Sequence, residues 1–270
     1  MRRSCFTLVE LLVVIATLAI LIAISLPSLR SSRQQTKAVL CSSNVKQLTL
    51  RLLLYETENQ TLPYGFNVED DSKGNPIKPP GGYPGNSAFD RKGWWWFNFI
   101  EGFYKKSDNK RTVVQCPSKR LSNPNLQNNI LCGNYGVNHS LCKSFDDIPS
   151  RREEFVGTPL CSEDISRPGE TLLVVDSGYS LISWWHATDV PPIPPGKTRE
   201  DTGYVPGLHI NTDRYVWPGQ ELDAVDGRHP NKTVNVGFAD SHVEKRKAES
   251  LFVEKTADGY RNKNPLWQPK

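Results

Sequence analysis

The sequence predicts an α+β protein in which one long N-terminal helix packs on an antiparallel β-sheet with long loops. A long apolar run near the N-terminus, an amphipathic stripe that continues it and several short alternating segments later in the chain predict this class. The 270 residues suffice for one good core. The 20 Pro and 19 Gly favour turns and loops over a helical bundle.

Composition narrows the class of protein further. The mean hydropathy is −0.49 even with the apolar N-terminus included, so the remainder is a polar domain. The net charge of +4 is modest and its Lys and Arg are dispersed, so we expect no nucleic-acid partner. Six cysteines fit a protein exported to an oxidising space.

The apolar run, Phe6 to Leu26, predicts a membrane-spanning helix. Its 21 residues would span about 31 Å as a helix, close to the hydrocarbon thickness of about 30 Å. Arg2 and Arg3 precede it, which predicts a cytoplasmic N-terminus and a single-pass protein with an extracytoplasmic head.

Glu10 lies inside this run, where an ionised group costs about 2.5–3.5 kcal/mol. A cleaved secretory signal ending near Ser25, a lipoprotein signal and a twin-arginine signal all leave Glu10 unexplained. A cut between Cys5 and Phe6 would explain it. Phe6 would then carry an α-amine one helical turn from Glu10, and Glu10 of one subunit could face the amine of its neighbour.

The stretch FTLVELLVVIATLAILIAISLP, after a short basic leader, resembles the N-terminus of type IV pilins and type II secretion pseudopilins. The resemblance implies a prepilin peptidase that cuts before Phe6 and methylates its amine. It also implies the assembly residues Glu10 and Pro27. Cys5 departs from the glycine that usually precedes the cut, and the leader, residues 1–5, is very short.

A second apolar stripe follows the membrane segment with steps of three and four residues, as on one face of an amphipathic helix. Its members are Ala38, Cys41, Val45, Leu48, Leu52 and Tyr55. We therefore expect one helix from Phe6 to about Tyr55, bent near Pro27. The expected domains are the leader 1–5, a membrane or filament-core helix 6–26, an amphipathic extension 27–60 and a globular α+β head 61–270.

Four short segments in the head are predicted to be strands: Thr112–Gln115, Thr171–Val175, Thr233–Phe238 and Ser241–Lys245. In the third, Val234, Val236 and Phe238 alternate with smaller or polar residues, which predicts one buried face. Asp70–Asp90 and Pro191–Pro206 are expected to be loops, and the tail from Lys255 to be loosely held. The aromatic clusters Trp94–Trp96 and Trp184–Trp185 are expected to pack in the core, with sugar stacking as the alternative.

His229, Asp240 and His242 are the candidates for a metal or catalytic site, because two imidazoles and a carboxylate can ligate zinc. Their spacing matches no zinc motif, so an Asp that closes a turn and a His bonded to backbone are the alternatives.

This region also resembles the C-terminal signature of a pseudopilin-like family abundant in Planctomycetes and Lentisphaerae, named for a His, nine residues and Asp-Gly. Here ten residues separate His229 from Asp240, and Ser241 replaces the glycine. Similar pieces occur as CSSNVKQLTL at Cys41, VVQCPS around Cys116, YGVNHS at Tyr135 and ISRPGETLLVVDS from Ile165 to Ser177. The resemblance implies export and architecture but no reaction.

Five cysteines remain if the leader is removed, so at least one is unpaired. We expect disulfides between Cys41 and Cys116 and between Cys132 and Cys142, with buried thiols as the alternative.

No cofactor is expected. Calcium is a weaker alternative at Glu69, Asp70, Asp71 and Asn75, which lack the spacing of a twelve-residue calcium loop.

These features predict a structural subunit, not an enzyme, held in the cytoplasmic membrane and assembled through its N-terminal helix into a type II secretion or type IV pilus-like filament. Its expected partners are other pilin-like subunits, the prepilin peptidase, an assembly platform and membrane lipid. The alternative is a membrane-tethered protein that binds glycans or a metal through the Trp clusters, His229, Asp240 and His242.

Overall fold

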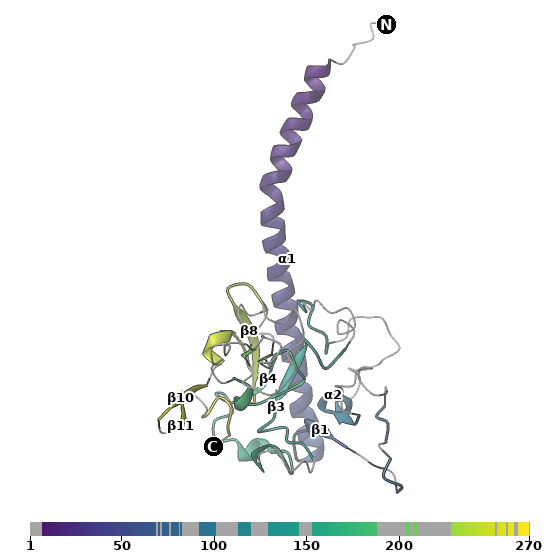
Figure 1. Cartoon of the computed structure of the whole chain (residues 1–270), viewed down its shortest axis with the longest axis vertical. Helices are drawn as coiled ribbons and strands as arrows, with labels where there is room; N and C mark the ends of the chain where they lie inside the picture. Colours follow the sequence, from purple (N-terminus) through teal and green to yellow (C-terminus); the bar gives the residue numbers. More distant parts are fainter. Residues whose placement is uncertain are drawn as a thin grey trace, which may run out of the picture.

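The computed structural model describes residues 7–68, 70, 72–75, 77–80, 82, 92–100, 113–119, 129–145, 153–187, 204–205, 208–209, 228–251, 253–257, 259–261 and 264–269. It is an α+β structure with one long helix, α1 (Leu8–Asn59), whose lower half lies against a sheet while its upper half projects from the head (Figure 1). The predicted class is therefore confirmed at this level.

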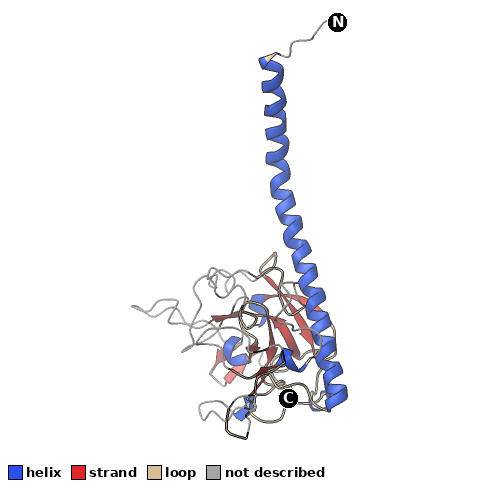
Figure 2. Cartoon of the chain, turned by 90° about the vertical axis from the view of Figure 1, so that its right-hand side faces the viewer, coloured by secondary structure: helices blue, strands red, loops and turns tan. Residues whose placement is uncertain are grey.

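Helix α1 has 52 residues, which corresponds to about 78 Å at 1.5 Å per residue. It continues through Pro27 and ends at Gln60, whose φ of 65° is left-handed. The predicted stripe is buried from Ala38 to Leu52, and Thr49 joins it. Tyr55 is half-buried. The side view shows this part of the helix along one side of the head (Figure 2).

The main sheet has the order β5-β3-β4-β8-β9. Its strands are β3 (Tyr135–Asn138), β4 (Leu172–Asp176), β5 (Leu181–Ile182), β8 (Thr233–Phe238) and β9 (Val243–Lys247). All neighbours pair antiparallel except β3 and β5, which are parallel, so the sheet is mixed rather than purely antiparallel.

Short elements surround this sheet. The remaining strands are β1 (Phe66–Asn67), β2 (Trp94–Trp95), β6 (Tyr204–Val205), β7 (Leu208–His209), β10 (Glu254–Thr256) and β11 (Gly259–Arg261). One helical turn, α2 (Trp96–Phe99), follows β2. The 3-10 turns are η1 (Glu153–Phe155), η2 (Ser162–Asp164), η3 (Trp184–Ala187) and η5 (Ala248–Leu251).

The strand predictions hold for β4 and β8, with β4 beginning and ending one residue later than expected. Strand β9 begins two residues later than predicted, because the loop after β8 runs to Ser241 and is closed by the bond between Phe238 and His242. The first predicted strand is wrong where the structure describes it, since residues 113–115 form a turn. Strand β3 was not predicted.

Both faces of β8 are buried, which corrects the expectation of one buried face. Val234, Val236 and Phe238 pack in a cluster with Trp184, Leu251 and Trp267. The opposite face of small and polar residues meets α1. A Cβ on Gly237 would overlap the Thr49 hydroxyl and lie 3.1 Å from a methyl carbon of Val45. Glycine therefore sets how closely the helix approaches the sheet.

The C-terminal tail is held in place where the structure describes it, contrary to expectation. Trp267 is fully buried, and its Nε1 donates to the Leu251 carbonyl at 2.9 Å. The Leu172 N–H donates to the Leu266 carbonyl at 2.9 Å, so the tail bonds to the first residue of β4. Residues 264–269 cover the face of the sheet that α1 leaves open.

Candidate functional site

Four side chains capable of binding a metal meet in the core between α1 and the sheet. They are Cys41, Cys116, Asp176 and His229, all buried. One ligand atom from each, the two Sγ atoms, a carboxylate oxygen and a ring nitrogen, lies within 4.8 Å of all the others. We call these four residues the Cys–Asp–His cluster.

Each member of the cluster comes from a different element. Cys41 belongs to the buried stripe of α1, and Asp176 is the last residue of β4. His229 lies just before β8, where it forms an antiparallel bridge with Thr233. Cys116 lies in a turn, and its N–H donates to Oδ1 of Asn134 at 3.0 Å. The cluster therefore joins the helix, the sheet and a loop.

Asp176 is at the centre of the cluster. Its Oδ1 accepts from Cys41 Sγ at 2.8 Å, and its Oδ2 lies 2.9 Å from His229 Nε2. Oδ2 also accepts from the backbone N–H of Asn235 at 2.7 Å and from its Nδ2 at 3.2 Å. These contacts orient the carboxylate toward both the thiol and the imidazole.

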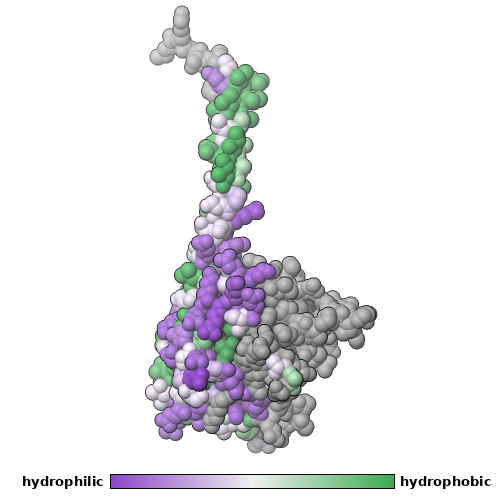
Figure 3. Space-filling view, turned by 90° about the vertical axis from the view of Figure 1, so that its left-hand side faces the viewer, coloured by the Kyte–Doolittle hydropathy of each residue, from purple (hydrophilic) through white to green (hydrophobic). Residues whose placement is uncertain are grey.

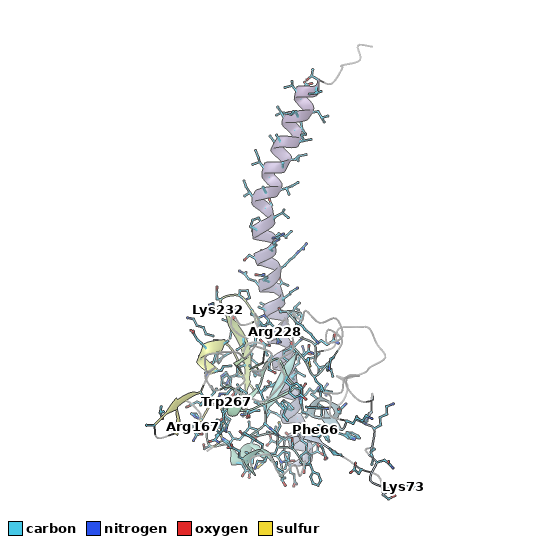
Figure 4. All side chains as sticks on the ribbon, viewed as in Figure 1. Phe66, Lys73, Arg167, Arg228, Lys232 and Trp267 are labelled. Carbon is cyan, nitrogen blue, oxygen red and sulfur yellow. The ribbon has the colours of Figure 1, made fainter. Side chains whose placement is uncertain are left out.

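Polar residues around the cluster fix its position. Cys41 Sγ lies 3.2 Å from the Tyr135 hydroxyl, which accepts from Asn44 Nδ2 at 3.2 Å. Arg228 is buried and donates to the carbonyls of Asn134 at 2.8 Å and Ser177 at 2.9 Å. Figure 4 shows Arg228 beside α1, at the level where the helix enters the head.

The charges of the cluster follow from burial and from the close contacts. Burial raises the pKa of the Cys41 thiol, and Cys116 and Asp176 raise it further. Burial also opposes the charged form of His229, but Asp176 raises its pKa to about 9. His229 in turn lowers the pKa of Asp176 against the effect of burial. Burial would raise the pKa of Cys116, yet its contact with Cys41 and the charge of Arg228 lower it.

The sulfur atoms of Cys41 and Cys116 lie 3.6 Å apart, and both residues are free thiols in the structure. The predicted pair is therefore adjacent, but a disulfide needs about 2.05 Å, so this bond stays a prediction. Cys132 and Cys142 are likewise not bridged by a disulfide, and strand β3 lies between them in the chain. The second predicted disulfide therefore also stays a prediction.

His229, Asp240 and His242 do not form one site. His229 precedes β8 and is buried against Asp176, whereas Asp240 and His242 follow β8 in an exposed turn. The six residues of β8 place the two ends about 17 Å apart at about 3.3 Å per residue. Asp240 Oδ1 instead accepts from the N–H of His242 at 3.0 Å and contacts its Nδ1.

The turn between β8 and β9 gives Ser241 an unusual backbone. The N–H of Phe238 donates to the His242 carbonyl, which leaves a three-residue loop, Ala239 to Ser241. In such loops the third residue is left-handed, and Ser241 has φ 79°. The turn forms despite the lack of glycine, and Lys46 Nζ donates to the Ser241 carbonyl at 2.6 Å.

Three tryptophans of the two predicted clusters pack in the core as expected. Trp95, Trp96 and Trp184 are each about 1% exposed, so they offer no open ring face to a sugar. Trp94 is half-buried and donates to the Ile77 carbonyl. The side chain of Trp185 lies outside the described residues, as do Glu69 and Asp71 of the predicted acidic loop.

At the N-terminus, Glu10 caps its own helix. Its Oε2 accepts from the Thr7 N–H at 2.8 Å and from the Thr7 hydroxyl at 2.7 Å, while the Glu10 N–H donates to Thr7 Oγ1 at 3.3 Å. This reciprocal capping box satisfies free donors at the start of α1. Cys5 and Phe6 lie outside the described residues, so the pairing of Glu10 with a Phe6 amine stays a prediction.

The sequence interpretation missed Asp176 and the meeting of His229 with two cysteines. One signal in the sequence could have revealed the cluster. Each family-like piece described above contributes one residue to the cluster or its surroundings: Cys41, Cys116, Tyr135, Asp176 and His229. The chain matches no protein-family model, no curated protein and no solved structure.

Proposed function

We propose that the protein is a membrane-anchored structural subunit that assembles, through the upper half of α1, into a filament of the type II secretion or type IV pilus kind. The observation that carries the proposal is the division of one continuous helix into an apolar half that is exposed in the described structure and a half that the head packs against.

The upper half of α1 has the length and composition to cross a membrane. Its most apolar window has a mean hydropathy of 2.8 and none of it is buried in the head. Thr17 and Ser25 donate their hydroxyls to the carbonyls of Val14 and Leu21, so neither needs an outside partner. Figure 3 shows this half as hydrophobic and the part nearer the head as hydrophilic. Lipid or neighbouring helices therefore suit its surface.

The lower half of α1 also exposes apolar side chains away from the sheet. Val39 is 69% exposed, Leu40 51%, and Leu50 and Leu54 47% each. Contact with α1 of an adjacent subunit would cover them, which supports assembly along the whole helix.

Under this proposal a prepilin peptidase cuts before Phe6, and the mature subunit waits in the cytoplasmic membrane with its head outside. An assembly platform then adds it to the filament. Glu10 meets the Phe6 amine of a neighbour and fixes the register of the helices.

The capping role of Glu10 can be separated from its charge. Gln can occupy the same position of a capping box and make its hydrogen bonds, but it carries no charge. Glu10→Gln should keep the helix start and abolish incorporation into filaments. Thr7→Ala removes the cap and keeps the charge, so it should leave incorporation largely intact. The measurement is the amount of each variant in sheared filament fractions, normalised to its amount in the membrane.

The opposite pattern would favour a simple tether. If Glu10→Gln is silent and Thr7→Ala is defective, Glu10 serves only its own helix, and the protein is a membrane-tethered head. Mass spectrometry of the mature N-terminus provides an independent check. A chain that begins at methylated Phe6 supports the proposal, and one that keeps residues 1–5 contradicts it.

A further inference from the structure

We propose that Cys41, Cys116, Asp176 and His229 form a structural zinc site that fastens α1 to the head. The inference concerns the folded head and is independent of filament assembly. It rests on the kinds of ligand, their separations, the environment of His229 and the charge of the surroundings.

The ligand set is one that zinc prefers. Two thiolates, one imidazole nitrogen and one carboxylate oxygen supply the four positions of a tetrahedral site. Calcium and magnesium take oxygen ligands, so a pair of sulfurs selects against them. The four protein ligands leave no open position, which is typical of structural rather than catalytic zinc.

The separations suit an ion at the centre. Zinc–sulfur bonds of about 2.3 Å at the tetrahedral angle place two sulfurs about 3.8 Å apart. The Cys41 and Cys116 sulfurs lie 3.6 Å apart. The 2.8 Å contact between Cys41 and Asp176 is a hydrogen bond. An ion that binds both atoms would release the thiol proton to solvent and place the sulfur and the oxygen about 3.5 Å apart. These are small shifts of side chains that are already assembled.

The surroundings of His229 indicate a bound ligand, because its ring nitrogens lack well-directed hydrogen bonds. The side chain is fully buried, yet within the described residues neither ring nitrogen makes a well-directed hydrogen bond. Its Nε2 contacts Asp176 only as an ion pair at 2.9 Å. Buried polar groups without directed partners are costly, and a bound metal would use one of these nitrogens.

The surroundings balance the charge of the occupied site. Zinc with two thiolates, a carboxylate and a neutral imidazole carries one net negative charge. Arg228 is 1% exposed and is held nearby by the carbonyls of Asn134 and Ser177. Its positive charge makes the buried assembly neutral, which limits the cost of burying it.

The site would connect parts of the chain that are far apart in sequence. Its ligands lie in α1, in a turn, at the end of β4 and before β8. Such a link stabilises the fold in the way that a disulfide does. A zinc site and a disulfide cannot form at the same two cysteines, because sulfurs bonded to each other no longer act as thiolate ligands. A Cys41–Cys116 disulfide is therefore the main competing outcome.

The test uses the full-length chain, extracted in detergent without chelator or reductant and analysed for metal and thiols. We expect about one zinc per chain and two unmodified thiols, at Cys41 and Cys116, that resist alkylation until a strong chelator is added. Chelation should lower the melting temperature of the wild-type head, and added zinc should restore it. Cobalt exchanged into the site should give thiolate-to-metal charge transfer and the strong visible bands of a tetrahedral ion.

Variants separate a specific site from adventitious metal. His229→Ala should lose the zinc, while His229→Cys should keep it and add a third thiolate band to the cobalt spectrum. Cys161→Ser is the matched control, because Cys161 is a partly exposed cysteine outside the cluster, and its zinc content should equal the wild type. A chain without zinc that carries a Cys41–Cys116 cross-linked peptide would overturn the proposal. The proposal would also be overturned if the zinc content per chain were unchanged in His229→Ala and also unchanged in wild-type protein after alkylation of Cys41 and Cys116.

Discussion

Replacing Gly237 with alanine tests how closely α1 approaches β8. The added Cβ would overlap Thr49 Oγ1 and lie 3.0 and 3.1 Å from methyl carbons of Val174 and Val45. Carbon atoms prefer about 3.5–4.0 Å, and all three neighbours are fully buried, so the helix must shift. Inserting one methylene into such a core costs about 1–3 kcal/mol. A loss of about 2 kcal/mol would lower the melting temperature of a head of this size by about 4–8 °C.

A double-mutant cycle assigns the cost to the helix contact. Thr49→Ala removes the overlapping hydroxyl, which bonds only to the Val45 carbonyl of its own helix within the described residues. The double variant should therefore lose less stability than the two single losses combined. Gly169→Ala is the control, because its Cβ would meet only the tip of the Asp240 carboxylate, at 3.0 Å. Thermal unfolding of the full chain in detergent, followed by circular dichroism, measures all four. An unchanged melting temperature for Gly237→Ala, or losses that add fully, would refute the argument.

Three further predictions concern the turn and the tail. Ser241→Gly should raise the free energy of unfolding by about 0.5–1 kcal/mol, since glycine adopts φ 79° without the cost that serine incurs; a loss of stability in thermal unfolding would contradict this. Burial raises the pKa of Asp240, but the backbone and side-chain hydrogen bonds with His242 outweigh it and lower the pKa, so the contribution of Asp240 to stability is present above the ordinary carboxyl pKa and is lost as pH falls. Asp240→Asn should therefore flatten the acid side of the melting-temperature profile, by under about 1 kcal/mol for so exposed a group, and an unchanged slope would count against it. Trp267→Ala should destabilise the head by about 3–5 kcal/mol, whereas Trp267→Phe should cost clearly less; equal losses would show that the tail does not pack as described.

Local periodicity made the helix and two strands predictable. The steps of three and four from Ala38 to Leu52 mark the face of α1 that meets the sheet, and the alternation in β8 marks its apolar face. The polar face of β8 was misjudged because Thr233, Asn235 and Gly237 resemble residues that face water. Their burial depends on a helix that comes from the other end of the chain.

The cluster could not be predicted from spacing. Its four ligands are dispersed from position 41 to position 229, and the sheet order that assembles them pairs β4 with β8 across more than fifty residues. Asp176 ends a strand, where a carboxylate commonly faces solvent, so nothing near it indicates a buried partner. His229 was found for its proximity in sequence to Asp240, whereas its contact in the fold is Asp176.

Residues 28–37 of α1 are exposed on every side, between the apolar half and the first buried residue, Ala38. At 1.5 Å per residue they form a rigid spacer of about 15 Å. If the apolar half fills the hydrocarbon layer, the head is held clear of the lipid surface rather than resting on it. Because the helix has no break across this spacer, a displacement or rotation of its membrane half would move the head with it.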